Sequence, residues 1–69
     1  MPPVSSSNVA AVDYDEGRRV LIVTYNSGAV YEYYPDVPRE VYEGVLNAES
    51  VGKAMNELVK PNYQYLRVN

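Results

Sequence analysis

The feature that most constrains the fold of this chain is a strand–turn–strand pattern over residues 19–34. Residues 19–25 are nearly all β-branched or apolar, which is typical of a β-strand. Asn26-Ser27-Gly28 then fits a three-residue hairpin loop, in which Gly28 takes the left-handed conformation that glycine adopts without strain. Residues 29–34 return as the next strand and stop before a proline. The pattern therefore predicts an antiparallel hairpin.

The length of this loop decides which residues of the two strands pair. A three-residue loop places Val23 opposite Tyr31, whereas a two-residue loop would place Val23 opposite Glu32. The better match of apolar partners favours the three-residue loop, which also sets Leu21 against Tyr33. Because side chains alternate across a strand, one face then carries Leu21, Val23, Tyr25, Ala29, Tyr31 and Tyr33. The other face carries Val20, Ile22, Thr24, Val30, Glu32 and Tyr34.

The remaining chain predicts one strand before the hairpin and two helices after it. Residues 8–14 look extended and end at the turn-prone residues 15–17. Pro38 suits a first helical position, and apolar residues then recur at helical spacing at Val41, Val45 and Leu46. Residues 47–49 break this helix, and Ser50 is a natural N-cap for a second one.

The second helix is expected to end at Pro61, because proline cannot continue a helix. Its buried side is predicted to consist of Val51, Ala54, Met55 and Leu58. Residues 62–68 alternate in polarity, and we expect this tail to pack back on the sheet or on the helices. The predicted fold class is α+β, with a three-stranded antiparallel β-meander followed by two short helices and a C-terminal extended tail. We expect residues 1–7 to form a flexible N-terminus and residues 8–69 a single domain.

The composition argues against catalysis and against a metal centre. The chain has no His and no Cys, so the commonest acid–base, nucleophilic and soft-metal groups are missing. The acidic segment 13–17 lacks the ligand spacing and closing glutamate of a calcium loop. We therefore expect a non-catalytic domain with no metal and no cofactor. The opening residues lack the pattern of a signal peptide, and no apolar run approaches the ~20 residues of a membrane span, so we expect a cytoplasmic protein.

Charge is distributed unevenly along the chain. Six basic against nine acidic residues give a net charge of −3. Residues 1–49 hold three arginines against eight acids, a net charge of −5, whereas residues 50–69 hold Lys53, Lys60 and Arg67 against Glu57 alone, a net charge of +2. The basic end could meet a phosphate backbone, although three solvated cations on a small domain need no partner.

The order of elements and several residues resemble the KTSC family, from about Ser6 to about Arg67. The resemblance is carried by Tyr14-Asp15, Leu21-x-Val23, Ser27-Gly28, Tyr31-x-Tyr33, Val37-Pro38, Ala48-x-Ser50-x-Gly52, Asn56, Tyr63 and Arg67. Tyr25 and Met55 depart from it, since Phe or another aromatic residue is expected there. This short domain occurs at the C-terminus of some lysyl-tRNA synthetases and as a stand-alone protein in bacteria and phages. The resemblance implies no established activity, and it suggests RNA binding only by association with a synthetase.

Two groups of residues are candidate binding sites. Tyr31 and Tyr33 project from one face of a strand and could stack on unpaired bases, but Leu21 and Val23 share that face, which favours its being the hydrophobic core. Ser50, Gly52 and Lys53 lie at a predicted helix N-terminus, where free N–H groups attract anions. Asn56 lies on the same side of that helix, and Arg67 adds a cation from the tail. The alternative is ordinary capping by Ser50, close packing at Gly52 and a solvated Lys53.

Two functions of different classes follow. The first is a module that binds RNA or tRNA, with Lys53, Lys60 and Arg67 on phosphates and a tyrosine face for bases. The second is a protein-interaction module or phage accessory protein, because an acidic body with exposed tyrosines suits a protein partner. The sequence leaves both open, and it does not indicate the oligomeric state.

Overall fold

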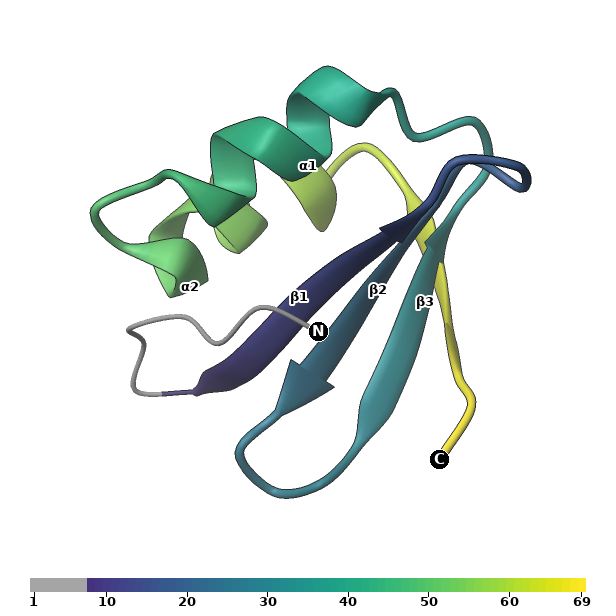
Figure 1. The fold of residues 1–69 in the computed structure, drawn as a ribbon. Coiled ribbons are helices and arrows are strands. Elements are labelled where there is room, and N and C mark those ends of the chain that lie inside the picture. Colours follow the sequence, from purple (N-terminus) through teal and green to yellow (C-terminus); the bar gives the residue numbers. More distant parts are fainter. Residues whose placement is uncertain (1–7) are drawn as a thin grey trace.

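In the computed structural model, which describes residues 8–69, four antiparallel strands form one sheet with the helices on one of its faces (Figure 1). The strands lie side by side in chain order and are β1 (Val9–Asp15), β2 (Val20–Tyr25), β3 (Val30–Tyr34) and β4 (Gln64–Arg67). The helices are α1 (Arg39–Leu46), α2 (Val51–Ala54) and η1 (Met55–Val59), a π-helical segment that continues α2. The predicted flexible N-terminus, residues 1–7, lies outside the described residues.

The predicted central hairpin is confirmed in both its turn and its register. Leu21 pairs with Tyr33 and Val23 with Tyr31. The loop closes through a hydrogen bond of 2.8 Å from the main-chain N–H of Tyr25 to the carbonyl of Ala29, and Gly28 has a φ of 94°. This is the left-handed conformation for which the sequence places a glycine in the loop.

The expectation of a three-stranded sheet is wrong, because the C-terminal tail forms a fourth strand. β4 pairs with β3, with Tyr33 opposite Tyr65 and Tyr31 opposite Arg67. All four side chains of β4 are exposed. The helices therefore do not cover this strand, which runs along the outer edge of the sheet (Figure 1). The alternating pattern of the tail predicted that it would pack back on the sheet or the helices, but such a short pattern does not say which element it pairs with.

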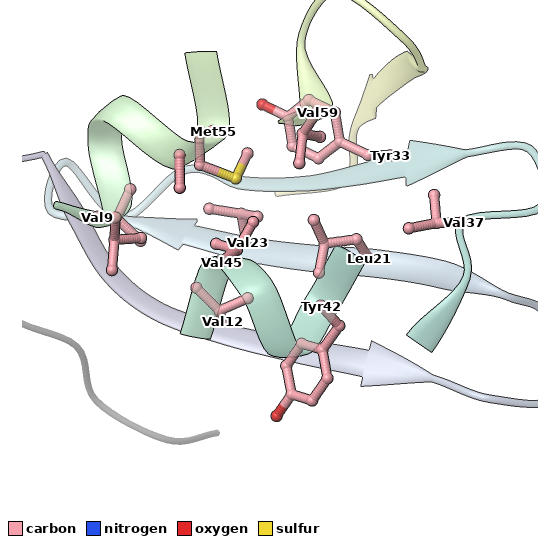
Figure 2. Close-up of a cluster of buried hydrophobic side chains, with 12 residues drawn as sticks. Val9, Val12, Leu21, Val23, Tyr33, Val37, Tyr42, Val45, Met55 and Val59 are labelled. Carbon is pink, nitrogen blue, oxygen red and sulfur yellow. The ribbon is translucent and has the colours of Figure 1, made fainter. Parts of the chain in front are cut away.

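The hydrophobic core fills the space between the helices and the face that carries Leu21, Val23 and Tyr33 (Figure 2). The helical side of this core comes from α1, α2 and η1, whose buried residues are Tyr42, Val45, Val51, Ala54, Met55 and Val59. In α1, Pro38 is the N-cap and not the first helical residue, and Tyr42 is buried although the sequence pattern did not select it. The ring of Tyr42 stacks on Tyr14 of β1 at a centroid distance of 5.5 Å.

The predicted buried side of the second helix is wrong at one position. Leu58 is 41% exposed, whereas Val59 is fully buried. The cause is the π-helical segment, in which the N–H of Lys60 donates to the carbonyl of Met55, five residues earlier, at 2.9 Å. A π turn holds one more residue than an α turn. The buried series therefore continues from Met55 to Val59 instead of to Leu58 (Figure 2).

Candidate functional site

A groove of about 960 Å³ opens where the α2–η1 segment faces strands β3 and β4. On the helical side it is lined by Ser50, Gly52, Lys53, Met55, Asn56 and Lys60. On the sheet side it is lined by Tyr31, Tyr33, Tyr65 and Arg67, and the end of β2, the β2–β3 loop and the start of β1 complete it. We call this surface the basic groove, since three of these side chains are cationic. It exists because the helices cover the core residues of β1, β2 and β3 but not the edge strand β4.

Pairing between β3 and β4 gathers the aromatic side chains of the groove. Residues directly opposite each other in an antiparallel pair project from the same face. Tyr65 therefore lies beside Tyr33, and Arg67 beside Tyr31, all on the face of the sheet that carries the helices. The Tyr65 ring centroid is 5.5 Å from that of Tyr31 and 6.3 Å from that of Tyr33. Tyr25 completes this cluster with an edge contact to Tyr31 at 5.4 Å.

The tyrosines of this cluster differ in how much of the ring a ligand could reach. Tyr33 is 3% exposed and belongs to the core, Tyr31 is half-buried, and Tyr65 is 64% exposed. The core alternative therefore holds for Tyr33, whose ring has no open face for a base. Tyr65 is the most exposed aromatic residue of this cluster.

A hydroxyl pair links the buried tyrosine to the groove. The Tyr25 and Tyr33 hydroxyl oxygens lie 2.6 Å apart. Burial, together with this hydrogen bond, raises the pKa of Tyr33 well above its usual range, and burial also raises the pKa of Tyr25. Both phenols are therefore neutral at physiological pH and act as hydrogen-bonding groups, not as anions.

The helical wall begins with an ordinary N-cap. The Ser50 hydroxyl accepts a hydrogen bond of 3.2 Å from the N–H of Lys53, so this predicted cap is confirmed and that N–H already has a partner. The Lys53 ammonium group is exposed and lies 3.9 Å from the carboxylate of Glu57, one helical turn further on. An exposed pair at this distance contributes at most about 1 kcal/mol, so it leaves Lys53 able to bind another anion.

Charge is separated between the basic groove and the rest of the molecule. Lys53, Lys60 and Arg67 line the groove, and none of the nine carboxylates of the chain does. Two of the other three cations are paired with acids elsewhere. Arg18 binds both Asp15 and Glu32, at 2.8 and 2.9 Å. Arg39 is similarly held by two glutamates, each at 3.2 Å. The groove is therefore locally positive on a molecule with a net charge of −3.

All seven residues predicted as site residues line this one groove: Ser50, Gly52, Lys53, Asn56, Arg67, Tyr31 and Tyr33. Their role in binding stays a prediction, and Tyr33 lines the groove from a buried position. The sequence analysis did not select Tyr65 or Tyr25 as site residues. The alternation of the tail was the available signal for Tyr65, but only the pairing of β4 with β3 brings that residue to the groove.

Across residues 8–69, no three His, Cys, Asp or Glu side chains are grouped so that they could hold a metal ion. None of the helices in the same stretch combines the length and apolarity needed to cross a membrane.

Comparison with known proteins shows which family the chain belongs to. Residues 5–63 match the sequence profile of the KTSC domain. The chain belongs to the KTSC domain family. A protein from Tsukamurella paurometabola is 42% identical over 64 residues, which cover 93% of this chain and 94% of the relative. An uncharacterized protein from Stutzerimonas stutzeri is 37% identical over 67 residues, which cover 96% of this chain and 93% of the relative.

Two further similarities extend the family in sequence and in structure. A lysine–tRNA ligase from Nostoc punctiforme is 32% identical over 59 residues, which cover 86% of this KTSC domain but only 10% of the ligase. The crystal structure of a KTSC domain protein from Yersinia pestis matches with a TM-score of 0.90 at 25% sequence identity, covering 99% of this chain and 94% of that one. The predicted family is thereby confirmed. The structural match covers nearly the whole of both chains, so it includes the part of this KTSC domain that forms the fourth strand.

Proposed function

We propose that this KTSC domain is a non-catalytic module that binds RNA in the basic groove. One observation carries the proposal: Lys53, Lys60 and Arg67 line a single groove that no carboxylate lines. Phosphate contacts made by Lys and Arg supply most of the affinity in non-specific nucleic-acid binding. A protein with a net negative charge can make such contacts when its cations are gathered in one place and its acids are elsewhere.

The other groove residues suit the same ligand. Asn56 and the Ser50 hydroxyl offer neutral hydrogen-bonding groups beside Lys53, and Tyr31 and Tyr65 offer aromatic surface on the opposite wall. Grooves that combine cations with aromatic side chains are the usual way in which proteins hold nucleic-acid strands. The lysine–tRNA ligase from Nostoc punctiforme contains a similar segment and acts, by its name, on a tRNA. RNA is therefore the nucleic acid that we propose as the ligand. We also propose that the protein acts in the cytoplasm.

The test is a titration of the 15N-labelled protein with a tRNA pool, followed through the backbone amide signals at 50 and 200 mM salt. We expect the largest shifts at residues 50–56, 60 and 65–67. If three phosphates are neutralised, the slope of log affinity against log salt is about 2 to 2.7, so this fourfold rise in salt weakens binding by about 20- to 40-fold. A flat titration at 50 mM salt would contradict the proposal.

Charge variants locate the site. Lys53→Ala, Lys60→Ala and Arg67→Ala should each weaken binding and reduce the salt slope by about 0.7 to 0.9. The matched control is Arg39→Ala, which removes an exposed cation that is held by two glutamates away from the groove. If the control weakens binding as much as the groove variants do, attraction is general and the groove is not the site.

A protein partner is the second candidate, favoured by the exposed apolar side chains of the C-terminal segment. Leu66 is 55% and Val68 is 48% exposed. Leu66 pairs with Glu32, on the face of the sheet opposite the helices. Leu66→Ala should weaken the binding of such a partner, whereas Lys53→Ala should not. Its affinity should also lack the steep salt dependence expected for RNA.

A further inference from the structure

We propose that the RNA bound in the basic groove is single-stranded, and that an unpaired base stacks on Tyr65. This inference rests on the proposed function and adds the class of RNA and the residue that selects it. It differs from the sequence-based hypothesis, which assigned stacking to Tyr31 and Tyr33, because Tyr33 is buried in the core.

Tyr65 is exposed and at the same time held in place. Its residue is 64% exposed, the highest value among the exposed large apolar side chains, yet its ring is supported by Tyr31 at 5.5 Å and by Tyr33 at 6.3 Å. Tyr33 is itself fixed by core packing and by the hydroxyl contact with Tyr25. A ring that is oriented before binding loses little conformational entropy when a base stacks on it. Tyr65 therefore offers a preorganised platform, which a freely moving surface tyrosine does not.

The cations around Tyr65 fit a backbone that passes beside the stacked base. Arg67 lies two residues further along β4, so it projects from the same face of the strand as Tyr65. Lys53 and Lys60 line the opposite, helical wall of the groove. A strand lying in the groove would thus have phosphate partners on both walls and its base on the sheet side. No carboxylate lines the groove to oppose this path.

Double-stranded RNA cannot use Tyr65 in this way. Within a duplex both faces of each base are covered by its neighbours, and recognition is restricted to the backbone and the minor groove. A duplex could still touch the three cations, so it should bind more weakly and should be indifferent to the Tyr65 ring. Dependence on Tyr65 therefore separates the two forms of RNA.

The experiment compares a 12-nucleotide unstructured RNA with the same strand annealed to its complement, both fluorescently labelled, by anisotropy at 50 mM salt. Tyr65→Ala should weaken binding of the single strand by about 5- to 150-fold. Tyr65→Phe keeps the ring and should bind within about twofold of the unaltered protein, since stacking needs no hydroxyl. The matched control is Leu66→Ala, which truncates the next exposed residue of the same strand on the other face of the sheet. Thermal unfolding of each variant confirms that it is folded.

The outcomes distinguish the two proposals. The stacking site is supported if the single strand binds, Tyr65→Ala weakens this binding and Leu66→Ala does not. If both RNAs bind and Tyr65→Ala leaves the single strand unaffected, or if the duplex binds as tightly as the single strand, the inference is wrong while the proposed function stands. The inference is also overturned if Leu66→Ala weakens binding as much as Tyr65→Ala. If neither RNA binds at 50 mM salt, the proposed function itself fails.

Discussion

From the π-helical segment η1 we predict which of two neighbouring side chains, Leu58 or Val59, contributes more to stability. A regular α-helix would lead to the opposite prediction. The structure buries Val59 completely and leaves Leu58 41% exposed. A regular helix continuing from Val51 and Met55 would bury Leu58 and expose Val59. Truncating each side chain to alanine in turn therefore tests the π turn, with the neighbouring residue as its matched control.

The expected magnitudes follow from burial. Val59→Ala removes two buried carbon groups, worth about 0.8 kcal/mol each, and the cavity left in the core adds to this. Alanine is the better helix former by about half a kcal/mol, so we expect a net loss of about 2 kcal/mol. Leu58→Ala removes a partly exposed side chain whose place water can fill, and we expect a loss of about 1 kcal/mol or less. In a regular helix Leu58→Ala would instead cost about 3 kcal/mol, as a buried leucine does.

The assay is urea and thermal unfolding followed by far-ultraviolet circular dichroism. For a domain of this size, a loss of 1 kcal/mol lowers the melting temperature by about 4–8 °C. Val59→Ala should therefore lower it by about 8–16 °C, and Leu58→Ala by at most about half as much. The slope of the free energy of unfolding against urea should not change, because the surface exposed on unfolding is nearly the same. A larger loss for Leu58→Ala than for Val59→Ala would refute the π turn.

Three further predictions concern stability. The pKa of Tyr33 is higher in the folded state than in the unfolded state, so the unfolded state loses this proton first as pH rises. The free energy of unfolding should therefore be fully retained below about pH 10. Above that pH it should fall by up to about 1.4 kcal/mol per pH unit. Tyr33→Phe should flatten this fall in alkaline urea titrations, and an unchanged slope would contradict it. Gly28→Ala should destabilise the protein by about 1–2 kcal/mol in urea unfolding, because φ is 94° there although no atom lies within 4 Å of an added Cβ; no loss would mean that the loop is not left-handed at that residue. Gly44→Ala should instead stabilise the protein by about 1 kcal/mol in the same assay, because alanine is the better helix former. The added Cβ would meet the Leu58 Cδ1 atom at 3.6 Å, an ordinary contact distance. A loss of stability would mean that α1 and η1 pack more tightly than this distance indicates.

Those parts of the fold that depend on local chemistry were predictable from the sequence. The match of apolar partners across the hairpin selected the three-residue β2–β3 loop, and the loop length fixes the register, so the pairing of Val23 with Tyr31 followed from a few neighbouring residues. Ser50 marked the start of α2 for the same reason, since a cap acts within one turn of the helix.

The parts that were missed depend on packing at a distance. Residues 64–67 form a strand because β3 offers an unpaired edge, and their own side chains stay exposed. The alternation of the tail indicated that it packs on the domain but did not show that it joins the sheet. The π turn is similarly invisible to a helical pattern, because Leu58 and Val59 are both apolar and either could be buried. Tyr65 joins the basic groove only through the fourth strand, so the missed strand and the missed site residue have the same cause.

The position of the acids explains how an acidic protein can present a cationic site. At physiological ionic strength the screening length is about 8 Å, and the molecule measures 27 × 24 × 21 Å. Acids on the far side of such a molecule contribute little to the potential within the groove, which depends on the charges that line it. Arg18 and Arg39 are each paired with two acids, which neutralise them locally. Lys53, Lys60 and Arg67 instead line a groove that no carboxylate lines, although Lys53 also lies 3.9 Å from Glu57 on the adjoining helical surface. The net charge of −3 therefore does not exclude a polyanionic ligand, because electrostatic attraction at this range is decided by where the charges lie and not by their sum.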